Sequence, residues 1–257
     1  MPLLLVLVAL LGLAVGSFLN VVIWRVPRDE SVVRPPSACP RCGHAIRARD
    51  NVPVVSWLLL RGRCRDCDAP ISARYPLVEA ATAVLFVGAA LVAGLTWTLP
   101  ALLYLAAISV ALTLIDVDVK RLPDAIVLPS YPVVAALLAL ASWGVGDWGA
   151  FVRALLGGAA LFVLYLVLAL IYPGGMGLGD VKLAGVLGLY LAWFGWATLV
   201  VGAFAAFLVG GVFGVVLLAA GRAGRKTGIP FGPWMLVGAA LGILVGEDVA
   251  AWYVGML

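Results

Sequence analysis

Eight long apolar runs, separated by short polar segments, make up most of this 257-residue chain. Most of the runs reach the ~20 residues that an α-helix needs to cross a bilayer. We therefore expect about eight transmembrane helices, with seven spans and one re-entrant segment as the alternative, because one run is short. The runs cover residues 2–24, 77–95, 98–116, 125–143, 150–172, 183–196 (the short one), 198–220 and 231–254.

Composition supports this pattern, since 64% of the residues are hydrophobic and only 12% are charged. Soluble domains have roughly half apolar and a quarter charged residues, so a water-soluble fold is excluded. The fold class is an all-α polytopic membrane protein. Residues 25–76 interrupt it with ten of the 17 basic residues and all four cysteines. We expect three parts: a retained first transmembrane helix at 1–24, a polar loop domain at 25–76 and a transmembrane core at 77–257.

Basic residues orient the spans. With the N-terminus outside and eight alternating helices, the inward segments are 25–76, 117–124, 173–182 and 221–230, and they hold 16 of the 17 basic residues. Only Arg153 then lies outside, in agreement with the positive-inside rule. This topology accounts for the net charge of +4. Because the arginines flank spans, no nucleic-acid partner is expected.

The four cysteines lie in two C-x-x-C pairs separated by 21 residues: Cys39, Cys42, Cys64 and Cys67. This spacing predicts a zinc-ribbon-like loop domain that holds one tetrahedral Zn²⁺. Unliganded thiols or a redox pair are the alternatives, and a reducing cytoplasm disfavours structural disulfides. Four thiolates close the coordination shell, so the metal is expected to be structural and to stabilise the folded loop. His44 is interpreted as a solvated loop residue.

Aspartates mark two span ends on the inward face. Asp116 ends the third run, and Asp180 follows the glycine-rich turn 174–179 before the sixth. The matched depth favours a dyad in which one carboxylate activates water and the other, protonated, donates to a scissile carbonyl. Gly177 and Gly179 would let an extended peptide approach the backbone. Taken singly, Asp180 could instead be an N-cap and Asp116 a solvated helix-end charge.

Neighbouring aspartates have simpler interpretations. Asp124 opens the next span after Leu-Pro, so an N-cap is its expected role. Asp118 is expected to face solvent or to pair with Lys120 or Arg121.

In its ordered motifs the chain resembles the bacterial type IV prepilin peptidases, which are bifunctional leader peptidase/N-methyltransferases. The resemblance covers nearly the whole chain. It is carried by Gly16–Val21 with Arg25 and Pro27, both cysteine pairs, Asn51–Pro53, Ser56–Leu58, Arg61–Cys64, Pro70–Ser72, Arg74–Glu79, Asp116–Asp124 and Gly177–Lys182.

This resemblance implies an intramembrane aspartyl protease of the G-x-G-D type whose catalytic pair falls on Asp116 and Asp180. It implies prepilin and pseudopilin substrates of type IV pili or type II secretion, whose basic leader is cut at the cytoplasmic face of the bacterial inner membrane. It also implies N-methylation of the new N-terminus with S-adenosylmethionine, an activity ascribed to members with the large first loop. No standard S-adenosylmethionine motif is present.

Two further residues are candidates for supporting roles. Glu79, at the inner end of the second span, could assist methyl transfer or bind the new amine, or could simply snorkel or pair helices. Lys182 could meet acidic groups of the substrate, the protein's own aspartates or membrane lipid. A non-enzymatic scaffold docking a partner through the cysteine loop, and a proton-coupled transporter, are the competing functional classes.

Overall fold

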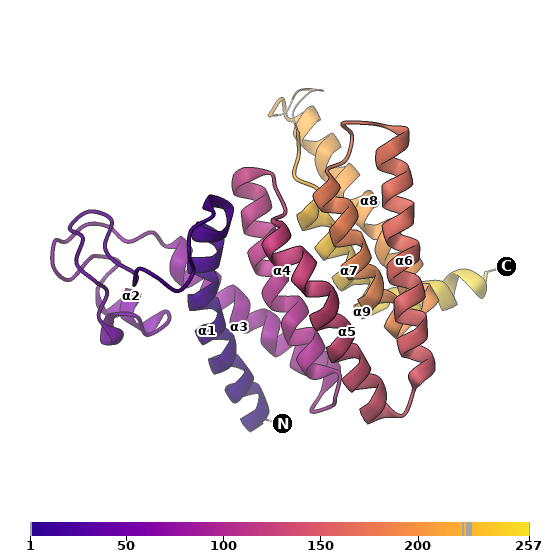
Figure 1. Ribbon diagram of the computed structural model, residues 1–257, viewed down its shortest axis with the longest axis horizontal. Coiled ribbons are helices and arrows are strands. Elements are labelled where there is room, and N and C mark those ends of the chain that lie inside the picture. The colour runs from indigo at the N-terminus through magenta and orange to yellow at the C-terminus, as the bar shows by residue number, and fades with distance from the viewer. Residues whose placement is uncertain (1, 223, 225–227, 257) are drawn as a thin grey trace. The chain divides into compact units, whose positions relative to one another are not determined.

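The computed structural model describes residues 2–222, 224 and 228–256, and their long elements are all helices (Figure 1). Two compact units divide the chain, residues 1–111 and 112–257. In chain order the elements are α1 (Pro2–Arg25), η1 (Val26–Arg28), η2 (Ala48–Asp50), α2 (Val55–Leu59), α3 (Arg74–Ala93), α4 (Leu99–Val119), α5 (Asp124–Val145), α6 (Trp148–Ile171), α7 (Leu178–Phe194), α8 (Trp196–Ala219) and α9 (Gly232–Val254).

Each of the eight apolar runs forms one long helix, which confirms the all-helical membrane fold. Among the described residues, seven helices are long and apolar enough to span a bilayer. The exception is α7, which has only 17 residues and arises from the short run. The elements α2, η1 and η2 lie in or beside the polar loop, where no hydrophobic period could predict them.

In the first unit, α1 and α3 pack closely through small residues. A Cβ on Gly12 would lie 2.6 Å from the Cα of Ala83, and one on Gly16 would lie 2.7 Å from the Cα of Glu79. Such contacts let helix backbones approach within a membrane, where packing rather than water exclusion drives association. A buried cluster that includes Val8 and Phe86 extends this packing.

In the second unit, α7 is the central helix and contacts α5, α6, α8 and α9 (Figure 1). Residues 183–193 are all buried, as expected for a helix that is apolar on every side. Near one end of α7, Lys182 pairs with Asp124 at the start of α5. At the other end, Trp193 donates a hydrogen bond to Ser142 near the end of α5. Hence α7 runs between the two ends of α5.

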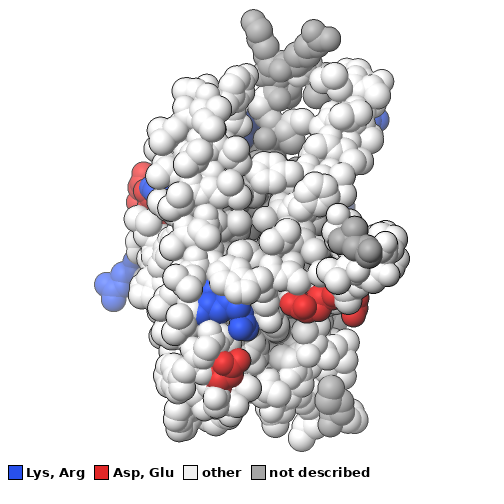
Figure 2. All heavy atoms as spheres, turned by 90° about the vertical axis from the view of Figure 1, so that its right-hand side faces the viewer, with Lys and Arg blue, Asp and Glu red and all other residues white. Residues whose placement is uncertain are grey.

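Arg153, the one basic residue expected outside, is a helix-capping residue. From α6 its guanidinium donates to the carbonyl oxygens of Ala192 and Trp193 at 2.6 and 2.7 Å. These carbonyls belong to the last turn of α7, where the helix dipole favours a cation. The charge is thus bound to the bundle, and the face seen in Figure 2 is mostly uncharged, with a few separate basic and acidic groups. Of the other basic residues, Arg225 and Lys226 lie outside the described residues.

Candidate active site and metal centre

Asp116 lies in the last turn of α4, and its side chain is buried rather than solvated. Its Oδ2 accepts a hydrogen bond of 3.0 Å from the backbone N–H of Gly232, the first residue of α9. The first N–H groups of a helix have no partner within it and carry partial positive charge, so they favour a carboxylate. One oxygen of Asp116 is therefore held by the start of another helix.

Asp180 lies in the first turn of α7, after an exposed glycine-rich turn. Its Oδ2 accepts the backbone N–H of Gly177 at 3.1 Å. Gly177 is the N-cap of α7, so Asp180 is not the N-cap that its sequence position also allowed; it is the third residue of the helix and bonds back to the N-cap N–H. This bond and a site role are compatible, because a carboxylate has lone pairs beyond the one that this bond uses. Asp180 is only partly exposed.

Leu122 links the surroundings of the two aspartates. A Cβ on Gly179 would lie 3.0 Å from the Cβ of Leu122, and a Cβ on Gly232 would lie 3.1 Å from its Cδ2. One of these glycines precedes Asp180 and the other is bonded to Asp116. The structure therefore brings Asp116 and Asp180 to one place at the ends of α4, α7 and α9.

An aromatic cluster lies beside these carboxylates. The ring of Tyr165 on α6 lies 5.4 Å from that of Phe207 on α8, and Phe207 lies 5.2 Å from Phe231, the residue before Gly232. Tyr165 is almost fully buried. Carboxylates beside apolar rings lie in a low dielectric, where charge interactions are strong.

Lys182 pairs with one of the protein's own aspartates, one of the three roles considered for it. Its Nζ lies 2.8 Å from both carboxylate oxygens of Asp124, and its backbone oxygen accepts the Tyr131 hydroxyl at 2.7 Å. The prediction that Asp124 caps α5 was wrong, since Pro123 is the N-cap and no side-chain cap bond forms. Asp118 is exposed, as expected.

Sequence reasoning missed Gly232, Phe231 and Tyr165. The segment Pro230-Phe231-Gly232-Pro233 before the last helix was the available signal, because proline near a helix start indicates where unpaired N–H groups begin. Nothing in a single sequence shows that these groups meet Asp116, which is 116 positions away.

The four cysteines form a separate cluster in the loop. Their ligand atoms all lie within 4.8 Å of one another, and the sulfurs of Cys39 and Cys67 are 3.8 Å apart. Tetrahedral coordination with metal–sulfur bonds of about 2.3 Å places sulfurs about 3.8 Å apart. The cluster therefore fits a metal site.

Two matching hairpins bring these sulfurs together. In the first, the Cys39 N–H donates to the His44 oxygen at 2.9 Å, and Gly43 has a φ of 73°. In the second, the Cys64 N–H donates to the Ala69 oxygen at 2.8 Å. Backbone N–H groups of Cys42 and Arg41 lower the pKa of the Cys39 thiol to about 6 and so favour the thiolate that binds metal.

His44 and Glu79 lie outside the described metal-compatible group. His44 is exposed at the hairpin turn, as expected. Glu79 is buried in α3, and its Oε2 accepts the backbone N–H of Val54 at 2.7 Å. It therefore ties the cysteine loop to a transmembrane helix.

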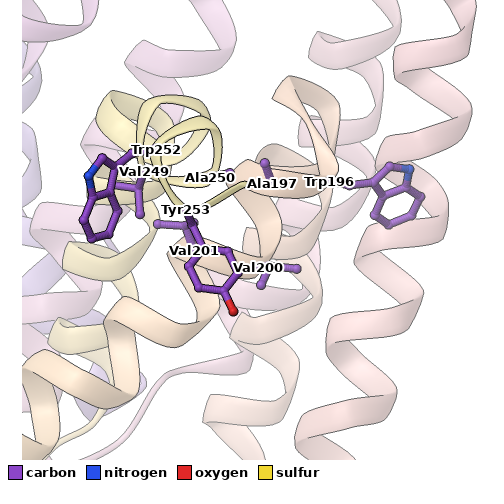
Figure 3. A pocket seen from close by; sticks show the side chains of 8 residues that line it. All are labelled: Trp196, Ala197, Val200, Val201, Val249, Ala250, Trp252 and Tyr253. Carbon is purple, nitrogen blue, oxygen red and sulfur yellow. The ribbon is translucent and has the colours of Figure 1, made fainter. Parts of the chain in front are cut away.

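A hollow between the start of α8 and the end of α9 carries none of this chemistry. Figure 3 shows it lined by apolar and aromatic side chains, with Trp196 and Trp252 on opposite sides. Asp116 is bonded to the other end of α9, so the hollow is distinct from the aspartate pair.

Comparison with known proteins matches two family models. Residues 10–93 match the bacterial peptidase A24 N-terminal domain, and residues 102–215 match the type IV leader peptidase family. No solved structure matches the chain.

Three curated relatives that match nearly end to end all carry the name prepilin leader peptidase/N-methyltransferase. The protein of Aeromonas hydrophila is 40% identical over 96% of this chain and 92% of its own length. That of Stutzerimonas stutzeri is 40% identical over 98% and 94%, and that of Pseudomonas aeruginosa 38% identical over 95% and 91%. The chain belongs to the type IV prepilin leader peptidase/N-methyltransferase family.

Proposed function

We propose that this protein removes the basic leader from type IV prepilins and pseudopilins and then methylates the new N-terminal amine with S-adenosylmethionine. The near end-to-end similarity to relatives with that name supports both activities. The observation that carries the peptidase is the juxtaposition of Asp116 and Asp180 around Leu122.

Peptide hydrolysis by such a pair needs only one shared proton. Two adjacent carboxylates do not readily ionise together, so one is protonated and the other ionised. The ionised carboxylate takes a proton from water as the water attacks the scissile carbonyl. The protonated carboxylate donates to the carbonyl oxygen, and collapse of the tetrahedral species expels the amine with a returned proton.

Backbone donors orient the two carboxylates for this exchange. In our proposal the Gly232 N–H fixes Asp116, the Gly177 N–H fixes Asp180, and each carboxylate has an oxygen left for water or substrate. The exposed turn 174–177 beside Asp180 offers an extended peptide a close backbone approach.

We infer that the N-terminus lies outside and that the cysteine loop and both aspartates lie on the cytoplasmic side of the inner membrane. The distribution of basic residues supports this orientation. The capping role of Arg153 supports it further, because the one apparent exception to the rule is bound to α7 carbonyls.

For the cysteine cluster we propose structural zinc held by Cys39, Cys42, Cys64 and Cys67. The tetrahedral sulfur spacing supports zinc, which would lend folding energy to a loop with little core of its own. S-adenosylmethionine supplies the methyl group when bound.

We propose that Glu79 is a positioning residue, which supports methylation by holding the loop at α3. The basis is its contact with the Val54 N–H. Glu79→Gln should keep zinc and cleavage but lower methylation, whereas direct binding of the new amine would show as a raised KM for the cleaved pilin.

The test is incubation of the reconstituted enzyme with a prepilin, with and without S-adenosylmethionine, followed by mass spectrometry of the N-terminus. Asp116→Asn and Asp180→Asn should each lose cleavage by about 10²-fold or more. Asp118→Asn is the matched control, because Asp118 is an exposed carboxylate two residues along the same helix. Normal cleavage by either dyad variant would refute the assignment, and function that depended on the cysteines alone would favour the scaffold.

A further inference from the structure

The short helix α2 turns an apolar face outward. Val55, Leu58 and Leu59 are 49, 61 and 78% exposed, and their spacing places them on one side of the helix. The other side is fixed to the loop, since Ser56 is buried and the Trp57 Nε1 donates to the Ile71 oxygen at 3.0 Å. The apolar face is therefore held outward by the fold.

The start of α2 is fixed to a membrane-spanning helix. Val54 directly precedes α2, and its N–H donates to Glu79 in the second turn of α3 at 2.7 Å. Val54 has a φ of 60°, a costly conformation for a β-branched residue, and it persists only where surrounding contacts enforce it. Hence α2 begins at the depth of the first turns of α3.

The path of the loop agrees with this depth. In Figure 1 the chain leaves the upper end of α1, and α2 lies to the side of α1 and below that end rather than beyond it. Because α1 and α3 are both long and apolar enough to span a bilayer, a helix beside their ends would lie at the edge of that bilayer.

Cations follow the apolar face directly. Arg61 and Arg63 are both exposed and come within four residues of Leu59. Apolar side chains beside basic ones are typical of segments that lie in the membrane interface, where arginine meets anionic headgroups.

We propose that α2 docks the cysteine loop on the inner leaflet, with Val55, Leu58 and Leu59 in the acyl–headgroup boundary and Arg61 and Arg63 on anionic lipid phosphates. Continuity with α3 and the charge of the rim favour lipid over a protein partner. The docking depends on membrane insertion and not on peptidase activity, so it can be tested in an inactive Asp116→Asn enzyme.

The experiment places a photoreactive benzophenone amino acid at position 59 of the full-length, zinc-loaded enzyme. The enzyme is reconstituted in vesicles of phosphatidylethanolamine and phosphatidylglycerol, irradiated and analysed by mass spectrometry. We expect a mass shift of one phospholipid at position 59. The matched control is position 46, because Ile46 is an exposed apolar residue of the first cysteine hairpin, and it should give no lipid adduct.

Adducts of position 59 with added prepilin, with a second copy or with another segment of the same chain would overturn the proposal, as would equal lipid adducts at 59 and 46. Absence of any adduct from an enzyme that retains its zinc would also overturn it. With Arg61→Gln and Arg63→Gln combined, the preference for phosphatidylglycerol in the adduct should be lost, and an unchanged preference would refute the role of the arginines.

Discussion

Substitution of Gly232 by alanine tests the geometry of the aspartate pair without removing a carboxylate. The new Cβ would lie 2.8 Å from Oδ2 of Asp116 and 3.1 Å from Cδ2 of Leu122, whereas ordinary contacts begin at 3.4 Å. Asp116 must therefore move by roughly 0.6 Å, and its hydrogen bond to the Gly232 N–H is strained or lost.

The magnitude follows from that bond. Hydrogen bonds to charged groups contribute about 1.5–3 kcal/mol, which corresponds to roughly 10- to 150-fold in rate if the bond acts in the transition state. Misplacement of a catalytic group by about 1 Å has a similar cost of roughly 100-fold. We expect Gly232→Ala to lower kcat/KM for prepilin cleavage by about 10- to 100-fold, and to lower the free energy of unfolding by at most the ~1.5–3 kcal/mol of this bond, so that the variant still folds.

The assay is cleavage of a purified prepilin, followed by mass spectrometry, with thermal unfolding measured in parallel. Gly211→Ala is the matched control, because Gly211 lies on an exposed part of α8 and an added Cβ there meets nothing within 4 Å. The control should cleave at the wild-type rate. A folded Gly232→Ala enzyme that also cleaves at the wild-type rate would refute the claim that this amide positions Asp116.

Three further outcomes are expected. Asp124→Asn should lower stability by at most about 1 kcal/mol and change cleavage less than about fivefold, since its partly exposed pair with Lys182 is screened by solvent; a complete loss of cleavage would instead place the pair in the catalytic machinery. Zinc chelation should loosen the loop in hydrogen exchange and abolish methylation before cleavage, because the cysteines and the aspartates belong to different compact units; simultaneous loss would contradict this separation. The Arg65 guanidinium bonded to Asp50 lowers the pKa of that carboxyl, so the contribution of the pair to loop stability is present above about pH 4 and is lost as the pH falls through the lowered pKa. The difference in loop stability between wild type and Asp50→Asn should therefore shrink at acid pH. A difference that does not depend on pH would rule out the pair as its cause.

The hydrophobic pattern predicted the helices well. Every long apolar run must be buried in the protein or face lipid, and its backbone N–H and C=O groups must then hydrogen-bond within the segment. The approach of Asp116 and Asp180 was also within reach, since span topology fixes depth. The groups that hydrogen-bond the polar side chains of the site could not be predicted. The Gly232 amide has no side-chain signature, and the partner of Lys182 lies 58 positions away at Asp124, so local capping rules assigned Asp124 to the wrong task.

The cysteine loop, too, was only partly predictable from the sequence. Spacing alone predicted the four-sulfur cluster, because the thiolates of two C-x-x-C pairs can together coordinate one metal ion. The attachment of the loop to α3 through Val54 and Glu79 was not predictable, since it depends on a valine in a backbone conformation that valine rarely adopts.

Because α7 is short, the thickness of the surrounding bilayer should affect the activity of the enzyme. Seventeen residues rise about 25 Å, roughly 5 Å less than the hydrocarbon core of a typical bilayer. Arg153 near the start of α6 holds the last turn of α7, and α6 has 24 residues against 17 in α7, so we expect Asp180 at the other end of α7 to lie below the membrane surface. Water and an unwound stretch of substrate must descend to it, or the lipid must thin around it. Bilayers with shorter acyl chains should therefore speed cleavage.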